Sequence, residues 1–237
     1  MQNRASLLVL FVWLAMALAY GVPSARAEDA KPNPCTEDAM LVFDASGSMS
    51  GPVLPGNGGT VSRIDWARAA LAEVLPSATK YHRIGLVTYG PGPYNQCNVE
   101  LNLKPTPNAG QIIMDIVNAL VPAGHTPLTA GVKQAADALD YTAKSGVIVV
   151  LTDGEETCGG SPCEIGKSLA ALGKHLTVHV IAYRPGVVSW MGEQSIGEAK
   201  CLADQTGGLY ITAKTQDDLV QALEKTLDCP MTSELTR

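Results

Sequence analysis

Ala39-Met-Leu-Val-Phe43 is an apolar run of strand length, and Asp44-Ala-Ser46-Gly-Ser48 follows it directly. The run predicts a buried β-strand, and the polar residues after it predict a tight turn at the end of that strand. The Asp44 carboxylate and the hydroxyls of Ser46 and Ser48 lie two residues apart, so all three can face one centre. Because no Cys or His lies among them, these oxygens favour a hard cation over zinc or copper, with Mg²⁺ first and Mn²⁺ or Ca²⁺ as alternatives.

The rest of the chain alternates strand-length apolar runs with segments of helical period, which is typical of a parallel sheet covered by helices. We therefore expect an α/β protein with a Rossmann-like, doubly wound sheet of six strands and helices on both faces. The short loop at residues 90–97 predicts that the second and third strands pair antiparallel, with the third at a sheet edge. The other strands should be parallel. The six predicted strands are Ala39–Phe43, Arg83–Tyr89, Asn98–Leu103, Val147–Thr152, Thr177–Ala182 and Gly208–Thr212.

The amino-terminal segment has the pattern of an export signal. Arg4 precedes an apolar stretch at residues 7–22, and Ala25-Arg-Ala27 supplies small residues for cleavage before Glu28. We expect cleavage after Ala27, which leaves residues 28–237 as a single domain exported to the bacterial periplasm or the extracellular medium. The alternative is an uncleaved anchor, but the stretch is shorter than the ~20 residues of a membrane span. No later apolar run is long enough to cross a bilayer.

Charge and cysteine content narrow the partners and the compartment. Without Arg4 and Arg26, the 17 Lys and Arg residues fall to 15 against 23 Asp and Glu, a net charge of −8. Such a chain would repel nucleic acid and anionic membranes. All six Cys residues follow the predicted signal, and an even number in an exported chain favours disulfides.

Two further segments place oxygen donors at the same rim of the predicted sheet. Asp153 follows the strand at residues 147–152, and Thr126 lies in a loop that leads into a helix. Ligands of an open parallel sheet bind beyond the carboxyl ends of its strands, where the strand order reverses. We therefore expect one divalent cation to be held by Asp44, Ser46, Ser48, Thr126 and Asp153. The alternative is that these side chains only cap turns and a helix.

These segments together resemble the von Willebrand factor type A domain, whose metal-ion-dependent adhesion site has the pattern Asp-x-Ser-x-Ser, then Thr, then Asp. The first motif is matched at residues 44–48, the second at Thr126 and the third at Asp153. The segments at residues 153–163 and 200–203 also resemble a bacterial exported subgroup of that family. The resemblance implies a binding module without catalysis, in which the ion captures an Asp or Glu of a protein partner.

The rim around the predicted site carries candidate partner contacts, for each of which a structural role is the alternative. They are His125 beside Thr126, Glu155 after Asp153, Trp190 after the fifth strand, and an insertion at residues 49–61. Two enzyme classes remain as alternatives: a metal-assisted hydrolase with Glu155 or Glu156 as base, and a phosphotransfer enzyme with Asp44 as nucleophile. A structural domain with a non-functional site is the third alternative.

Cysteine positions predict two disulfides. Cys158 and Cys163 lie close together beyond Asp153, so a local bridge is expected there. Cys35 precedes the first strand and Cys229 ends the last helix, so both should lie at the opposite face of the sheet and can bond. Elimination leaves Cys97 and Cys201, which the predicted fold places beyond the ~7 Å that a disulfide tolerates between Cα atoms. Either this assignment is wrong, or these two are free or intermolecular.

Overall fold

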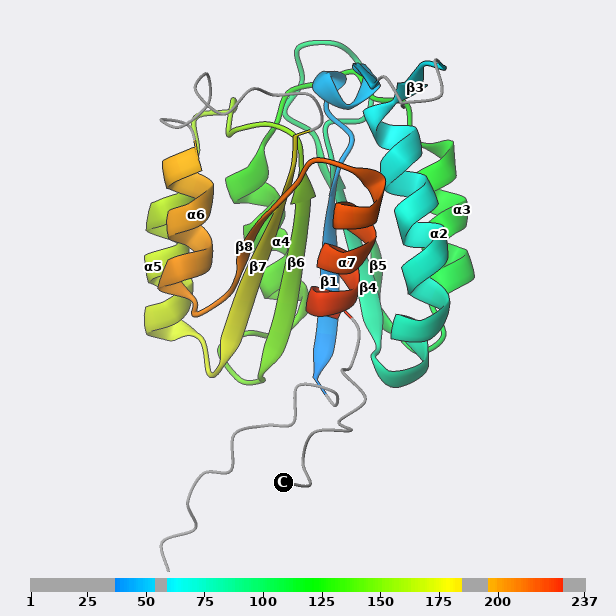
Figure 1. Ribbon diagram of the computed structural model, residues 1–237. Coiled ribbons are helices and arrows are strands. Elements are labelled where there is room, and N and C mark those ends of the chain that lie inside the picture. The colour runs from blue at the N-terminus through cyan, green and yellow to red at the C-terminus, as the bar shows by residue number, and fades with distance from the viewer. Residues whose placement is uncertain (1–36, 54–58, 185–195, 228–237) are drawn as a thin grey trace, which may run out of the picture. The chain divides into compact units, whose positions relative to one another are not determined.

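A six-stranded sheet lies at the centre of the computed structural model, which describes residues 37–53, 59–184 and 196–227 (Figure 1). The strand order is β5-β4-β1-β6-β7-β8, and only the pair β4 and β5 is antiparallel. The predicted sheet, with its antiparallel edge strand, is therefore confirmed. The strands are β1 (Asp38–Asp44), β4 (Ile84–Tyr89), β5 (Val99–Thr106), β6 (Gly146–Thr152), β7 (Leu176–Tyr183) and β8 (Tyr210–Ala213).

Helices cover both faces of the sheet because the central strands are apolar on both sides. In β1, Leu41 and Phe43 face α2, α3 and α7, whereas Met40 and Val42 face α4, α5 and α6. This alternation follows from the two-residue period of a strand, and it gives the domain two buried cores. The helices are α2 (Arg63–Tyr81), α3 (Gly110–Ala119), α4 (Leu128–Ala138), α5 (Pro162–Leu172), α6 (Ile196–Gln205) and α7 (Gln216–Leu227).

Hydroxyl caps start three of these helices, as the spacing of hydroxyl and acidic residues in the sequence indicates. Ser62 accepts a hydrogen bond from the Asp65 amide at the start of α2, and Ser161 accepts one from the Glu164 amide in α5. At α7, Thr215 and Asp218 exchange hydrogen bonds as a capping box. The caps fix where α2 and α5 begin, and the start of α2 places Arg63 beside Asp153.

The two described ends of the insertion pair with each other. The 3₁₀ turn η2 (Gly47–Ser50) overlaps the end of the first motif, and β2 (Pro52–Val53) pairs antiparallel with β3 (Val61–Ser62). Met49 is fully buried in the core, so its side chain is no partner contact. Because β3 leads directly into α2, the insertion delivers Arg63 to the rim.

Several predictions lie outside the described residues: the export signal, Trp190, and the Cys35–Cys229 bridge. They remain predictions. Among the helices that are described, none is long and apolar enough to cross a membrane.

Candidate metal centre

The candidate site lies at the carboxyl ends of β1 and β6, which are neighbours in the sheet. Asp44 ends β1, and Asp153 follows β6 directly. After β1 the chain crosses to β4 on one side, and it later returns to β6 on the other side. The strand order therefore reverses here, which is where an open α/β sheet binds its ligands.

Hydrogen bonds join the first and third motifs across 105 residues of sequence. Ser48 Oγ lies 2.6 Å from Asp153 Oδ1, to which it donates, and 3.0 Å from Ser46 Oγ. Ser46 is buried, whereas Ser48 is exposed. The row of oxygens therefore runs from the end of the sheet outward to solvent.

Backbone contacts bring Thr126 to the same place. Gly47 N donates to Gly124 O at 2.9 Å, which fixes the loop before α4 against the first motif. A Cβ added at Gly154 would lie 3.6 Å from Thr126 Oγ1 and 3.7 Å from Ser48 Oγ. The two hydroxyls therefore face the same small space beside Asp153.

Glycine is required where the loop after β4 supports the first motif. Gly90 has a φ of +80°, and a Cβ there would lie 2.6 Å from Ser46 N. An L side chain would be strained at that φ and would displace Ser46. Gly90 is thus part of what positions the serine hydroxyls.

Asp44 is fully buried, and each of its oxygens accepts a hydrogen bond. Oδ1 accepts from Ser46 N at 2.7 Å, and Oδ2 accepts from Thr152 Oγ1 at 2.7 Å. Burial, and to a smaller extent the charge of Asp153, raises the pKa of Asp44 to about 6. Sequence reasoning missed Thr152, although a hydroxyl directly before Asp153 at a strand end is a visible signal.

Arg63 was also missed by sequence reasoning. Its Nη1 lies 2.6 Å from Asp153 Oδ2, and the Asp153 side chain has no exposed surface. This partly buried ion pair joins the start of α2 to the end of β6. Nothing in the sequence around Arg63 indicates a partner 90 residues away.

The donor set suits a hard divalent cation. Two carboxylates and three hydroxyls meet at one partly open rim, and oxygen ligands with free positions for water are what Mg²⁺ prefers. Within the described ranges, no cluster of three or more His, Cys, Asp or Glu side chains could hold a metal ion, so a zinc-type site is not offered there. The residues present therefore fit the expected ion.

Two of the predicted rim residues, His125 and Glu155, lie in the loops that hold Thr126 and Asp153. His125 is exposed, and its backbone amide donates to Gln96 O at 2.9 Å. Glu155 is half exposed, with Oε1 3.9 Å from Arg184 Nη2. Both side chains are therefore accessible from solvent.

Glu156, the other carboxylate considered as a hydrolytic base, has a structural role. Its Oε2 accepts from the Thr129 amide at 2.8 Å, and its Oε1 accepts from the Cys158 amide at 2.7 Å. It also lines a cleft of about 360 Å³ with Glu155 and Glu198. Because both oxygens of Glu156 are engaged, it caps the first turn of α4 and holds the loop after Asp153.

Replacing Glu156 tests this structural role. Glu156→Ala removes two hydrogen bonds to a charged acceptor, so the free energy of unfolding should fall by about 2 kcal/mol in a urea titration. Mg²⁺ affinity, measured by calorimetry, should stay within about threefold of the wild type because Glu156 is no predicted ligand. A stable variant would contradict the capping role.

The disulfides differ from the predicted pairing. Cys158 and Cys163 do not bond to each other: Cys158 pairs with Cys97, and Cys163 pairs with Cys201. The reason is that α5 begins at Pro162, so Cys163 already lies on a helix and faces α6. Cys158 lies in the preceding loop and meets Cys97 from the loop before β5. The predicted Cys158–Cys163 pairing was wrong, and it was this pairing that left Cys97 and Cys201 over as an implausible pair.

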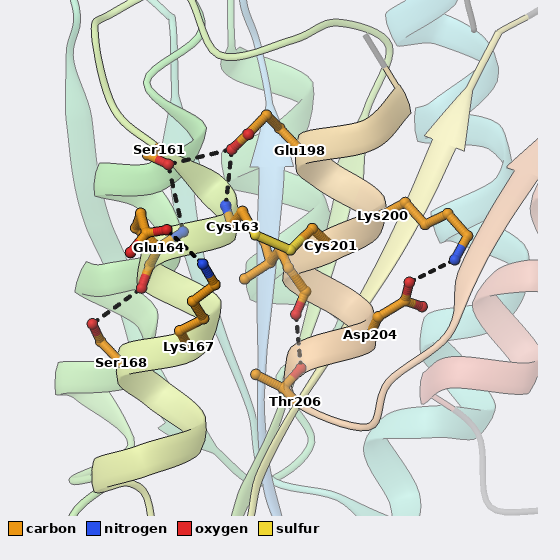
Figure 2. Close-up of a disulfide and its surroundings, with 11 residues drawn as sticks. Ser161, Cys163, Glu164, Lys167, Ser168, Glu198, Lys200, Cys201, Asp204 and Thr206 are labelled. Carbon is orange, nitrogen blue, oxygen red and sulfur yellow. Dashed lines mark hydrogen bonds and ion pairs between the residues drawn. A yellow bond between two sulfur atoms is a disulfide. The ribbon is translucent and has the colours of Figure 1, made fainter. Parts of the chain in front are cut away.

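Figure 2 shows the bridge between Cys163 on α5 and Cys201 on α6. Glu198 of α6 accepts from the Cys163 amide at 3.1 Å, beside Ser161. Thus α6 holds the start of α5 both covalently and by a charged cap. The Cys97–Cys158 bridge, in contrast, joins two loops at the rim of the candidate site.

The sequence pattern of the von Willebrand factor type A domain matches residues 39–156. The uncharacterized protein YwmD of Bacillus subtilis (strain 168) is 31% identical over 202 residues, which cover 79% of this chain and 84% of YwmD. The uncharacterized protein YwmC of the same organism is 27% identical over 194 residues, which cover 77% of this chain and 79% of YwmC. The chain therefore belongs to the von Willebrand factor type A domain family.

Solved structures share the fold at low sequence identity. BatB from Bacteroides thetaiotaomicron has a TM-score of 0.56 and 19% identity, covering 80% of this chain and 98% of BatB. The vWF domain of the type V pili tip protein Mfa5 from Porphyromonas gingivalis has a TM-score of 0.56 and 15% identity, and the match covers 79% of this chain and 92% of the Mfa5 domain. The pilus adhesin SpaC from Lactobacillus rhamnosus GG has a TM-score of 0.58 and 17% identity, and the match covers 84% of this chain and 30% of SpaC.

Proposed function

We propose that this protein is an exported, metal-dependent protein-binding module without catalytic activity of its own. One divalent cation, Mg²⁺ before Mn²⁺ or Ca²⁺, would be held at the rim of the sheet and would capture an Asp or Glu of a protein partner. The residues that would hold it are Asp44, Ser46, Ser48, Thr126 and Asp153.

The observation that carries the proposal is the contact of Ser48 Oγ with both Ser46 Oγ and Asp153 Oδ1. It brings three of the five predicted donors together from two distant segments. A serine pair that only capped its own turn would have no reason to reach Asp153. The adhesin and pilus proteins among the structural neighbours are consistent with a binding role.

Access to the site favours a partner side chain over a small buried substrate. Ser48 is exposed, whereas Asp44 and Ser46 are buried, so the site opens on the side of Ser48. A bound dication would supply an electrophilic centre for a carboxylate oxygen at that opening. His125 and Glu155 flank it on neighbouring loops.

Export is supported by two observations. The amino-terminal pattern predicts a cleaved signal, and two disulfides form between cysteines that are distant in the sequence. Such bridges persist in oxidising compartments. The proposed location is therefore the periplasm or the extracellular medium.

Mg²⁺ should stabilise the native protein. Because the unfolded chain does not assemble the five donors, Mg²⁺ at about 100 times its dissociation constant should add about 2.7 kcal/mol to the free energy of unfolding. Thermal unfolding with Mg²⁺ and with chelator measures this difference. An unchanged melting temperature would favour the structural alternative with a non-functional site.

Partner capture tests the function itself. The purified protein should retain an exported protein in the presence of Mg²⁺ and release it on addition of chelator. Changing one Asp or Glu of the captured protein to Asn or Gln should then abolish retention. Equal capture with and without metal would show that the candidate site is not the binding surface.

A further inference from the structure

We propose that Arg63 determines the specificity of this site, because it stays paired with Asp153 and leaves the metal-loaded site with one net positive charge. The site would then select partners that present a single carboxylate. This inference rests on the proposed metal-dependent function, and it assigns Arg63 a role that the five predicted donors do not include.

The two oxygens of Asp153 are divided between two functions. Oδ1 accepts from Ser48 Oγ at 2.6 Å, and Oδ2 lies 2.6 Å from Arg63 Nη1. The guanidinium therefore uses the oxygen that is not directed at the serine pair. Arg63 and a cation beside Ser48 can be held by the same carboxylate without competing for one oxygen.

Arg63 is fixed in this position by its backbone and by packing. It is the first residue of α2, and its amide donates to Gly51 O at 3.0 Å. A Cβ added at Gly51 would lie 3.4 Å from Arg63 Cζ, so the guanidinium packs against that glycine. The Arg63 side chain is 25% exposed, which leaves part of it accessible from solvent.

The pair with Asp153 dominates the contacts of the guanidinium. Nη1 is also 3.5 Å from Ser48 O, a distance at the limit of a hydrogen bond, and Nε finds no acceptor among the described residues. Among the described residues, Arg63 is the cation that pairs with the buried Asp153 carboxylate, and breaking this pair would be costly, so the pair should persist when an ion binds beside Ser48.

The charges at the site make Arg63 decisive. Asp44 and Asp153 carry two negative charges when ionised, and the hydroxyl donors carry none. A dication alone would then give a site without net charge, which would attract a carboxylate only through the open coordination positions of the ion. With Arg63, the loaded site carries one positive charge, which a single partner carboxylate neutralises. Among the described residues of the neighbouring loops, Arg184 and Glu155 lie 3.9 Å apart and offset each other, and the carboxylate of Glu156 accepts from the amides of Thr129 and Cys158.

The test compares Mg²⁺ affinity by titration calorimetry in four proteins. Arg63→Gln should bind Mg²⁺ more tightly than the wild type by about tenfold or more, because a positive charge beside the site is removed. Arg63→Lys keeps the charge and should stay within about threefold. Lys133→Gln removes an exposed charge on α4 and should match the wild type.

Carboxylate binding should change in the opposite direction. The probe is the blocked peptide acetyl-Gly-Glu-Gly-amide, titrated at saturating Mg²⁺ and followed by protein NMR shifts, with the Gln peptide as its control. Arg63→Gln should bind the Glu peptide about tenfold more weakly than the wild type. If Arg63→Gln does not fold, Arg63→Met, which retains the aliphatic stem, is measured in its place.

The outcomes separate this inference from the proposed function. A wild type that binds no Mg²⁺ overturns both. If the wild type binds Mg²⁺ but the neutral Arg63 variants bind it equally well or more weakly, only the role of Arg63 is overturned. Tighter Mg²⁺ binding together with weaker binding of the Glu peptide supports it.

Discussion

Asp44→Asn should weaken Mg²⁺ binding strongly and, in the same protein, raise the stability of the metal-free state. Asp44 is one of only two carboxylates in the donor set, so its loss should weaken Mg²⁺ binding by about 100-fold or more. Asn keeps the size of the side chain and an acceptor for the Ser46 amide, so the loop after β1 should be preserved. Titration calorimetry measures the affinity, and urea unfolding in chelator measures the stability.

The gain in stability follows from the buried charge. Burial and the charge of Asp153 raise the pKa of Asp44 to about 6 in the folded protein, above its ordinary value of 3.8. Ionised Asp44 therefore destabilises the native state at neutral pH, and a neutral Asn removes that cost, which is about 3 kcal/mol. The native protein retains this cost because the ionised form is the one that can ligate a cation.

The same shift predicts how the difference depends on pH. Because the folded pKa is raised, the native state binds more protons than the unfolded state between about pH 4 and pH 6. The advantage of Asp44→Asn should be complete above pH 6 and should disappear as the pH falls toward 4. In the wild type, Mg²⁺ affinity should fall by about tenfold per pH unit below pH 6, because one proton competes with the ion.

Asp38→Asn is the matched control because it changes a carboxylate on the same strand at the opposite end. Asp38 pairs with Arg83 at 3.4 Å, far from the serine pair along β1. It should leave Mg²⁺ affinity unchanged. Mg²⁺ binding that survived Asp44→Asn would remove Asp44 from the donor set, and a less stable variant would show that its buried charge carries no cost.

The sheet and most of the candidate site could be predicted because their signals are local. Each buried strand is a continuous apolar run, and Asp44 and Asp153 each follow such a run directly. Once the sheet is parallel, the carboxyl ends of its strands must share one rim. The short loop before Asn98 was sufficient to place β5 antiparallel at the edge.

What could not be predicted depends on contacts between segments distant in the sequence. Arg63 reaches Asp153 only because the insertion returns through β3 to the rim, and its own neighbours give no sign of that. The prediction of the cysteine pairing was wrong for the same reason. Nearness in sequence favoured Cys158 with Cys163, but the start of α5 between them turns the two side chains toward different partners.

Of the two disulfides among the described residues, the Cys97–Cys158 bridge should cause the larger loss of Mg²⁺ binding when it is removed. Cys97→Ser with Cys158→Ser opens a cross-link between residues 61 positions apart, and Cys163→Ser with Cys201→Ser opens one between residues 38 apart. By chain entropy, each bridge should contribute about 4 kcal/mol to the free energy of unfolding, so the two variants should be destabilised almost equally. Urea unfolding of both variants measures this.

The two variants should differ in Mg²⁺ affinity because only the Cys97–Cys158 bridge links loops that carry or support the predicted metal ligands. The Cys97–Cys158 bridge connects the loop that supports Thr126, through His125 N and Gln96 O, to the loop that follows Asp153. Without it, Thr126 and Asp153 are less firmly held together, and Mg²⁺ binding should weaken by about tenfold. The α5–α6 variant, equally destabilised but intact at the rim, should keep wild-type affinity below its melting temperature. Equal affinity in both variants would mean that the hydrogen bonds of the rim, without the covalent link, already position the donors.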